Sequence, residues 1–348
     1  MIIINDGYRL LKGGKVNEGG MARIGAIIEW LKNEKNAGEL KLDHNKIINA
    51  ISVIHFLLCV KNETVICFYP AVGLPILKKG IIGRFSSWLF ISLLRKTCTS
   101  NRVIIDISDL KYEQAKDLEI YTDRLAILDY LERGVFSLDS EFLFASGSMR
   151  NYAIGKYRIS SERSYVLDNG GDFAFCEIRI PDHHGKRRLI YSGTLNKGRQ
   201  IEKMIDVVSN IPNTVLYLCG RGGEWIESND NCVYLGALDE DKAHYLVSKC
   251  DIGLIPYDET RMYYNIAYPT KLGFYITAGV PFLSTDVSEV RVIQEKYDIG
   301  YVGSIADWGT ILNTIGEEDI KSQKDRIELV KTEFTWDYKC RHSILNTL

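Results

Sequence analysis

Short apolar runs alternate with longer amphipathic stretches along the chain, and this alternation constrains the fold more than any other feature. Strand, helix and strand at such spacing are typical of βαβ units, in which the strands run parallel. The first half therefore predicts an α/β structure with a parallel sheet. Its strand-like runs are 2–5, 64–69, 102–107 and 142–146, and its helix-like stretches are 21–35, 44–60, 80–96 and 123–133.

The same pattern starts again after a turn signal, Asp168-Asn169-Gly170-Gly171-Asp172. Two such segments in 348 residues predict two Rossmann-like domains, at 1–170 and 171–333. The strand-like runs of the second half are 189–192, 215–219, 233–235, 252–256 and 280–284, and its helix-like stretches are 201–210, 240–249, 271–278 and 289–296.

Charge and cysteine content exclude several classes of protein. The formal net charge is -2, which gives no overall attraction to nucleic acid. The eight cysteines include no C-x-x-C pair, which argues against a zinc site or a dithiol redox motif and favours a reducing compartment. Residues 1–6 lack signal-peptide character, and no apolar run reaches the roughly 18 residues of a membrane span. We therefore expect a cytoplasmic protein.

Three loops that follow strands of the second half suit a phosphate-bearing ligand: 191–199, 218–223 and 267–272. Ligands of parallel sheets bind at the carboxyl ends of the strands. Glycines in these loops let backbone amides approach an anion, and lysine and arginine at helix starts supply positive charge. Each loop alone is equally an ordinary turn of an α/β fold. Their joint placement on one domain favours a diphosphate site.

Several motifs in the second half occur in the order that GT-B glycosyltransferases of the family 4 kind have them. The chain resembles this family over residues 141–345. The resemblance implies an α/β GT-B fold with two Rossmann-like domains that face each other across a cleft. It also implies that 334–348 form a C-terminal helix that returns to the first domain. The motifs are "YxGxL…KGxxxLI" at 189–204, "NVxfxG…aDvgliPy" at 231–257, "PxKlxEYxAaGxPvv" at 268–281 and "fsW" at 334–336.

The resemblance implies residues that bind a nucleotide-diphosphate sugar, for which a UDP-sugar is the first choice. Arg199 and Lys271 would stabilise the departing diphosphate, with Lys197 as a third cation. Because these cations replace a metal ion in that role, we expect neither a metal nor a cofactor. The other donor-binding residues would be Ser192, Gly193, Thr194, Gly220, Arg221, Gly236, Tyr268, Pro269 and Thr270.

The chain departs from the family pattern at three positions. Phe274 and Ile266 stand where retaining members have glutamates, so retention and inversion of the sugar configuration both stay open. Thr194 stands where relatives have an arginine, which leaves Arg199 to supply the charge.

The first domain would bind the acceptor, which is a glycan, a lipid-linked glycan or a glycoprotein. Gly19, Gly20 and Arg23 resemble a "GGxxR" loop that faces the donor in relatives, although a plain strand-to-helix turn explains the glycines equally well. An inverting enzyme needs a general base. Asp106 and Asp109 follow a strand and are our candidates, with Asp6 next, although an aspartate there is also a common cap.

Residues 78–96 combine lysines and arginines with apolar and aromatic side chains, and no acidic residue occurs between Glu63 and Asp106. A basic amphipathic helix of this kind suits peripheral contact with the inner face of the cell membrane. The alternative is an ordinary helix whose apolar side packs on the sheet.

Two other functions fit the same nucleotide-sugar pocket: a GT-B-fold nucleotide-sugar epimerase and a non-catalytic nucleotide-sugar-binding subunit. A dehydrogenase is disfavoured, because neither half has G-x-G-x-x-G followed by an acidic residue about twenty positions later.

Overall fold

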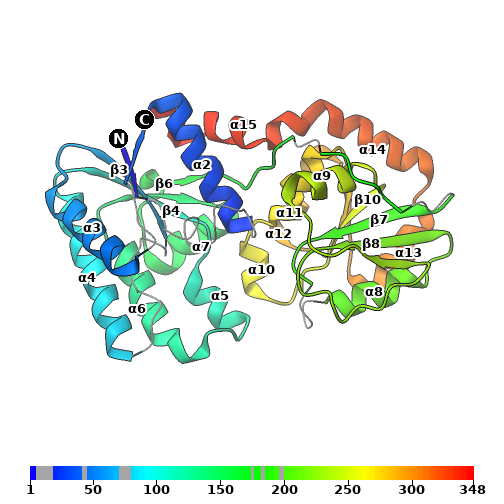
Figure 1. Ribbon diagram of the computed structural model, residues 1–348, viewed down its shortest axis with the longest axis horizontal. Helices are drawn as coiled ribbons and strands as arrows, with labels where there is room; N and C mark the ends of the chain where they lie inside the picture. The colour runs from blue at the N-terminus through cyan, green and yellow to red at the C-terminus, as the bar shows by residue number, and fades with distance from the viewer. Residues whose placement is uncertain (5–18, 41–44, 70–79, 174–175, 182–184, 196–199) are drawn as a thin grey trace. The chain divides into compact units, whose positions relative to one another are not determined.

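The computed structural model describes residues 1–4, 19–40, 45–69, 80–173, 176–181, 185–195 and 200–348. The chain forms two compact units (Figure 1). Unit 1 comprises Met1–Asp168 and Cys340–Leu348, and unit 2 comprises Asn169–Lys339. The first boundary lies within the turn that the sequence marks as the end of its first half.

Unit 1 contains a six-stranded parallel sheet in the order β2-β1-β3-β4-β5-β6. Val65 lies opposite Val103 and Ile66 opposite Ile104, so the apolar runs of neighbouring strands are in register. These residues are buried, as expected for a parallel sheet covered on both faces. The strands are β1 Ile2–Ile4, β2 Gly38–Glu39, β3 Thr64–Tyr69, β4 Arg102–Ile107, β5 Glu141–Phe144 and β6 Ser164–Val166.

The helices of unit 1 begin at local capping signals where the sequence provides them. The Asn45 side chain accepts a hydrogen bond from the Ile47 amide at the start of α3, and the Ser146 hydroxyl accepts one from Met149 at the start of α7. The helix α4 packs between α3 and α6. The helices are α2 Gly19–Lys35, α3 Lys46–Cys59, α4 Gly80–Cys98, α5 Lys111–Asp117, α6 Leu125–Phe136 and α7 Gly147–Tyr157.

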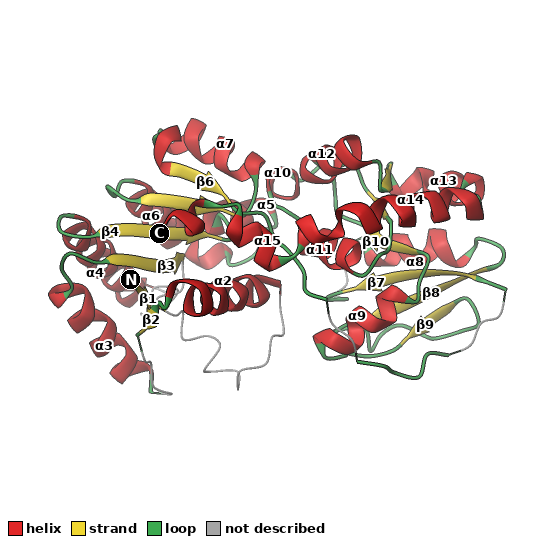
Figure 2. Ribbon diagram, turned by 90° about the horizontal axis from the view of Figure 1, so that it is seen from above, coloured by secondary structure: helices red, strands yellow, loops and turns green. Residues whose placement is uncertain are grey.

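Unit 2 repeats this architecture with a parallel sheet in the order β12-β11-β10-β7-β8-β9 (Figure 2). Two hydrophobic clusters fill the space between sheet and helices. The strands are β7 Arg187–Ser192, β8 Thr214–Cys219, β9 Cys232–Tyr234, β10 Ile252–Ile255, β11 Phe282–Ser284 and β12 Gly300–Val302. The helices are α8 Ile201–Ser209, α9 Glu240–Ser248, α10 Met262–Ile266, α11 Thr270–Thr277, α12 Ser288–Tyr297, α13 Trp308–Thr314, α14 Glu317–Val330 and α15 Trp336–Arg341.

The C-terminal tail belongs to both units, because α15 begins in unit 2 and ends in unit 1. Its last residues contact α2: Arg341 pairs with Glu34 at 2.8 Å, and Lys35 donates to the Asn346 carbonyl at 2.7 Å. The expected return of the C-terminal helix to the first domain is therefore present. None of the described helices combines the length and apolar content that crossing a bilayer requires.

The two parallel α/β units confirm the fold predicted from the alternating pattern. That pattern does not predict the short strands β2 and β12, nor the helices α5, α7, α10, α13 and α14. Two or three residues at a sheet edge are too few to show a periodicity, and α5, α10 and α13 are short as well. α14 has 14 residues, but only four of them are apolar, so its pattern is weak.

Candidate functional site

The loop after β7 brings its backbone against a lysine of α11. Gly193 has a φ of +146°, a conformation that side chains rarely adopt, and its amide donates to the Cys219 carbonyl at 2.8 Å. A Cβ at Gly193 would lie 2.9 Å from the Lys271 Nζ. A glycine is therefore required here for the Lys271 ammonium group to approach the loop.

The loop after β8 packs directly on the loop after β7. Gly220 has a φ of +148°, and a Cβ there would overlap the Gly193 carbonyl. The Gly220 amide donates to the Gly236 carbonyl at 2.9 Å, and the Leu195 amide donates to the Arg221 carbonyl at 2.8 Å. The carboxyl ends of β7, β8 and β9 are thus joined by backbone contacts, and the contact between Gly220 and Gly193 leaves no room for a side chain at Gly220.

Lys271 lies in the first turn of α11, after Pro269 as the N-cap residue. Its Nζ is 4.8 Å from the centre of the Tyr191 ring and 5.5 Å from that of Tyr257. The electron-rich faces of the two rings stabilise the ammonium group without neutralising it. Lys271 can therefore present positive charge at the carboxyl edge of the sheet, next to a helix start.

The Tyr275 side chain of α11 supports the carboxyl edge of the sheet through its hydroxyl group. The Ser192 amide donates to its hydroxyl at 3.1 Å, and the hydroxyl donates to the Leu254 carbonyl at 3.1 Å. Burial raises the pKa of Tyr275 well above its ordinary value, so the phenol stays protonated. The sequence motifs assigned no role to Tyr191, Tyr257 or Tyr275. The spacing of these tyrosines in the sequence does not reveal their role, because each contacts residues that are far away in the chain.

The turn at the start of unit 2 supports the opposite side of α11. A Cβ at Gly273 would lie 2.9 Å from the carbonyl carbon of Gly170. The Asn169 side chain donates to the Tyr268 carbonyl at 3.3 Å, and the Gly171 amide donates to the Phe334 carbonyl at 2.9 Å. This turn and the "fsW" segment together fix the helix that carries Lys271.

The remaining predicted donor residues differ in exposure. Ser192, Thr194, Gly236 and Thr270 are half-buried, and Arg221 is exposed. Tyr268 and Pro269 are buried, so they support the loop rather than line an open surface. Lys197 and Arg199 lie outside the described residues.

The two positions that lack the family's glutamates are filled by apolar packing. Phe274 makes an edge contact with the His244 ring, with 5.1 Å between the ring centres. His244 is buried, and its Nε2 lies 3.2 Å from the Thr277 hydroxyl. Ile266 is buried in α10. Neither position offers a carboxylate, in agreement with the sequence.

Two residues that the sequence placed at the donor-facing cleft are paired inside unit 1 instead. Arg23 and Asp106 are each only 1% exposed. The Arg23 guanidinium donates to the Asp106 carboxylate at 2.6 Å through Nη2 and to the Leu167 carbonyl at 2.6 Å through Nη1. Burial raises the pKa of Asp106, and the charge of Arg23 opposes this effect. This geometry argues against Asp106 as an accessible base and against Arg23 as a ligand contact, since both serve the core.

The other predicted residues of unit 1 are less constrained. Gly19 and Gly20 form the first turn of α2. Asp109 is half-buried beyond the end of β4, where its Oδ2 lies 2.7 Å from the Lys111 Nζ. Asp6 lies outside the described residues. Asp109 is therefore the remaining described candidate for a base. Within the described part of the chain, no three His, Cys, Asp or Glu side chains are grouped as a metal site.

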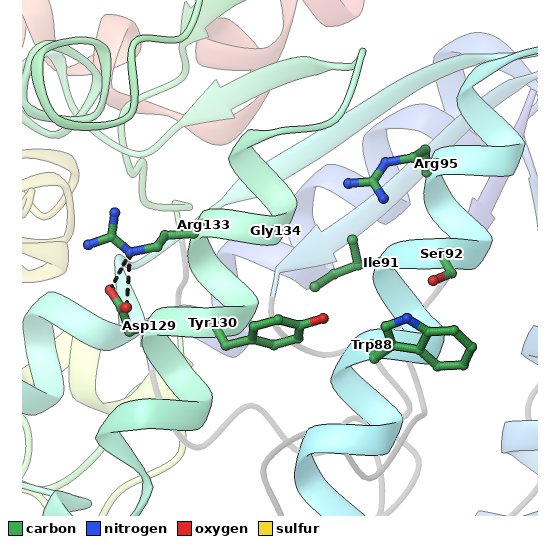
Figure 3. A pocket seen from close by; sticks show the side chains of 8 residues that line it. All are labelled: Trp88, Ile91, Ser92, Arg95, Asp129, Tyr130, Arg133 and Gly134. Carbon is green, nitrogen blue, oxygen red and sulfur yellow. Dashed lines mark hydrogen bonds and ion pairs between the residues drawn. The ribbon is translucent and has the colours of Figure 1, made fainter.

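A groove of about 380 Å³ lies between α4 and α6 of unit 1 (Figure 3). The helices approach closely at its floor, because a Cβ on Gly134 would overlap the Ile91 side chain. The Tyr130 ring points from α6 toward Trp88 of α4, and the Arg95 guanidinium points from α4 toward α6 (Figure 3). Two aromatic rings, two arginines and the Asp129 carboxylate thus border an open groove that the sequence did not predict.

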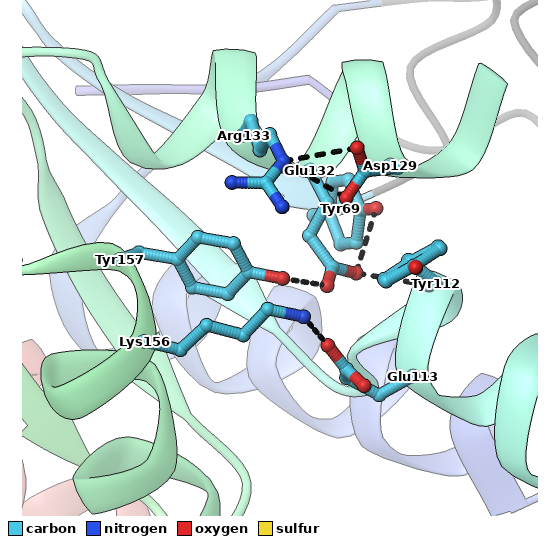
Figure 4. A network of polar contacts seen from close by, with 8 residues as sticks. All are labelled: Tyr69, Tyr112, Glu113, Asp129, Glu132, Arg133, Lys156 and Tyr157. Atoms are coloured by element: carbon cyan, nitrogen blue, oxygen red, sulfur yellow. Dashed lines mark hydrogen bonds and ion pairs between the residues drawn. The ribbon is translucent and has the colours of Figure 1, made fainter. Parts of the chain in front are cut away.

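A buried polar cluster lies between α5, α6 and α7 (Figure 4). Its centre is Glu132, which is fully buried and accepts hydrogen bonds from the Tyr157 hydroxyl at 2.5 Å, the Tyr69 hydroxyl at 3.2 Å and the Tyr112 amide at 3.0 Å. Burial raises the pKa of Glu132 to about 7, and its three hydrogen bonds oppose this effect. Next to it, Lys156 forms an ion pair with Glu113.

A family model matches part of the sequence, and solved glycosyltransferases resemble the fold. Residues 189–346 match the family described as glucosyltransferase 3-like, C-terminal domain. No curated protein sequence matches the chain. HepE of Anabaena has been solved with UDP and glucose and with UDP-glucose. Its TM-score to this chain is 0.63 at 11% identity, with 99% of this chain and 98% of that chain covered.

Two proteins of lipopolysaccharide synthesis are similar in structure as well. WaaG, a glycosyltransferase, has a TM-score of 0.58 at 15% identity and covers 85% of this chain and 93% of its own. The outer core galactosyltransferase WaaB has a TM-score of 0.59 at 12% identity, with 100% of both chains covered. These similarities confirm the predicted fold. The family match shows that residues 189–346 are similar to the glucosyltransferase 3-like C-terminal domain.

Proposed function

We propose that this chain, which has the GT-B fold, is a glycosyltransferase that takes a sugar from a nucleotide-diphosphate sugar bound by unit 2. The observation that carries the proposal is the placement of the Lys271 ammonium group against the Gly193 loop. Two glycines that admit no side chain and a cation held between two rings meet at the carboxyl edge of the sheet. A diphosphate needs such an arrangement of amides and positive charge.

The chemistry assigned to this site is the departure of a nucleoside diphosphate. The bond between the sugar C1 and the phosphate oxygen breaks, and its electron pair stays on the diphosphate. An acceptor hydroxyl forms the new bond to C1 and loses its proton. Lys271 stabilises the charge that grows on the leaving group, and Arg199 acts with it, so that no metal is required. Lys197 assists them as a third cation.

The donor is a UDP-sugar in this proposal, because HepE, which shares the fold over nearly the whole chain, binds UDP-glucose. Ser192, Gly193 and Thr194 lie against the phosphates, and Gly220, Arg221 and Gly236 border the nucleoside. Tyr268, Pro269 and Thr270 form the wall from which Lys271 projects. Phe274 and Ile266 bring no carboxylate to the sugar, which leaves the stereochemical outcome to experiment.

The acceptor is a glycan, a lipid-linked glycan or a glycoprotein that unit 1 binds, with Asp109 as the candidate base. Support for a lipid-linked acceptor comes from α4, where Phe85 and Trp88 are exposed beside Arg84. Peripheral membrane contact through 78–96 would keep the protein in the cytoplasm at the inner face of the cell membrane.

The test combines binding and turnover on the purified chain. Titration with UDP and UDP-glucose should show saturable binding that raises the melting temperature, since the ligand binds only the native state. UDP should appear only when an acceptor is supplied, and EDTA should not reduce its rate. UDP-glucose conversion without an acceptor would indicate the epimerase. Binding without turnover across glycan and lipid-linked acceptors would indicate the non-catalytic subunit. Loss of activity in EDTA with recovery in Mn²⁺ would refute the metal-free mechanism.

A further inference from the structure

The outer surface of α3 carries apolar side chains that do not pack against the protein core. Ile47, Ile51 and Leu58 follow one face of the helix at helical spacing, and Ile47 is 71% exposed. The opposite face, with Val53 and Leu57, is buried. An ordinary helix of an α/β fold needs only this second face to be apolar.

The exposed face of α4 continues this surface. Ile81, Ile82, Phe85 and Trp88 are exposed, and Ile81 is 86% exposed. The same side of the helix then turns cationic at Arg95 and Lys96, and Arg84 stands among the apolar residues. Neither α3 nor α4 contains an aspartate or glutamate. The exposed side of both helices is therefore apolar and positively charged.

The two helices run side by side in the same direction, because each leads from one parallel strand to the next. The Thr97 hydroxyl donates to the Leu57 carbonyl at 3.1 Å, and the Lys96 Nζ donates to the Leu58 carbonyl at 3.4 Å. Leu57 and Leu58 of α3 are thus level with Thr97 and Lys96 of α4. Because the helices run in the same direction, Ile47, ten residues earlier, is level with the turn of α4 that carries Trp88. The apolar residues of both helices thus form one band, and the cationic end lies on one side of it.

The distances along α4 suit the boundary of a bilayer. At 1.5 Å per residue, Arg95 lies about 15 Å along the helix from Phe85. With the N-terminal end of α4 deepest, this length spans the roughly 5–10 Å that interfacial segments bury and the headgroup level above it, where aromatic side chains are common. Trp88 and Tyr130, which are both half exposed, stand between the apolar band and Arg95. The apolar, aromatic and cationic side chains thus follow one another in the order of the acyl chains, the interface and the anionic headgroups that they would contact.

The α4–α6 groove opens beside this band and adds a place for a headgroup. The Arg95 Nη2 donates a hydrogen bond to the Ser137 hydroxyl at 3.2 Å, and the guanidinium has further N–H groups that can bind an anion. Within the described residues, the Tyr130 hydroxyl makes no hydrogen bond. The nearby Asp129 carboxylate is engaged by the Arg133 Nε at 2.9 Å to both oxygens, which reduces its repulsion of an anion.

We propose that the band of α3 and α4 docks on an anionic lipid bilayer, with a headgroup phosphate in the α4–α6 groove bound by Arg95 and the Tyr130 hydroxyl. A lipid surface fits better than a soluble saccharide, because a saccharide would leave Ile47, Ile51 and Ile81 in water. The inference rests on the membrane contact that belongs to the proposed function, and it adds a second helix and a headgroup site.

The test is flotation of the whole chain with vesicles of phosphatidylcholine alone or with roughly 30% phosphatidylglycerol, because an anionic surface attracts basic segments by roughly 1 kcal/mol per basic residue. Wild type should bind the anionic vesicles at least tenfold more tightly, and salt should weaken this binding. Arg95→Gln with Tyr130→Phe should lose about fivefold or more on anionic vesicles only. Ile81→Ser with Phe85→Ser should lose about tenfold or more on both vesicle types.

The matched control is Arg291→Gln with Arg326→Gln, which removes one exposed and one half-buried arginine of unit 2 and should bind vesicles like wild type. All substituted side chains are at least partly exposed, so melting temperatures should stay close to wild type. The UDP-induced thermal shift, measured without vesicles, should also be retained in every variant. If wild type fails to bind UDP while the vesicle results hold, the proposed function fails and the lipid surface stands.

Four results would overturn the inference or a part of it. Equal binding to both vesicle types, or no loss in the groove variant, would remove the headgroup site. Sedimentation velocity that shows a wild-type dimer dissociated by Ile81→Ser with Phe85→Ser would assign the band to a second copy of the chain. A melting temperature raised by inorganic phosphate alone in wild type and not in the groove variant would assign the groove to a free anion.

Discussion

Glu132 shows how a single buried carboxyl can make the stability of unit 1 depend on pH. Its pKa is raised from the ordinary 4.5 to about 7 by burial, so the folded chain holds this proton at pH values where the unfolded chain has released it. Stability from this group is therefore full below pH 4.5 and is lost as the pH rises to about 7. The loss amounts to about 3 kcal/mol.

Glu132→Gln should remove this dependence, because an amide fills the same space and carries no charge. Urea unfolding at pH 5 and pH 8 should show that wild type loses more stability between the two values than the variant does. Glu162→Gln, on an exposed glutamate, is the control and should keep the wild-type difference. An identical difference in Glu132→Gln and wild type would contradict the raised pKa.

Lys271→Ala should reduce turnover by roughly 10²-fold, because the growing charge on the diphosphate loses its fixed cation. Steady-state rates with UDP-glucose measure this. Lys296→Ala is a matched control, since the Lys296 Nζ also lies over a tyrosine ring, 4.4 Å from the centre of Tyr297, but outside the site. It should react at the wild-type rate. Equal rates for all three proteins would remove Lys271 from the mechanism.

At the scale of single residues the sequence predicted that Lys271 lies in the first turn of a helix, because proline and lysine at a helix start form a local signal. It could not assign Asp106, whose partner Arg23 lies 83 residues away. Both residues stood in positions that suit a cleft, and only the tertiary contact shows that they neutralise each other. A charge after a strand carries no information about such a partner.

Among the elements, the loops after β7 and β8 depend on glycine at two contacting positions. Gly220→Ala would force a Cβ into the Gly193 carbonyl at a φ of +148°, which should cost about 2 kcal/mol or more and displace the loop that faces Lys271. We expect a lower melting temperature and weaker UDP binding by titration.

Gly155→Ala in α7 is the control for this change. A Cβ there meets nothing within 4 Å, so alanine should be neutral or stabilise the helix by up to about 1 kcal/mol. If Gly220→Ala behaves like Gly155→Ala in both measurements, the close contact of the two loops is not needed for the site.

The central strands were predictable because continuous apolar runs such as 64–69 and 214–219 are buried on both faces. The carboxyl ends of β7 and β8 follow from them, and so does the position of the loops that we propose for donor binding. The close contact of Gly193 with Gly220 did not follow, since it depends on how the two loops pack. The exposed apolar side chains of α3 could not be predicted from the sequence either, because composition does not reveal which apolar residues lie outside the core.

For the whole molecule, both hydrophobic clusters of unit 2 lie between residues 178 and 334. A fragment of residues 169–339 should therefore fold alone, melt cooperatively and bind UDP with the affinity of the whole chain. Circular dichroism and titration calorimetry measure this, with the Lys271→Ala fragment as a control that folds and binds weakly. A fragment without a cooperative transition would show that unit 2 needs unit 1.

The path of the tail also affects how the protein is made. Unit 2 is an insertion within unit 1, because residues 169–339 interrupt a unit whose remaining nine residues, Cys340–Leu348, come last. Unit 1 can therefore reach its full set of contacts only after the ribosome has made all of unit 2, whereas unit 2 is encoded by one unbroken segment.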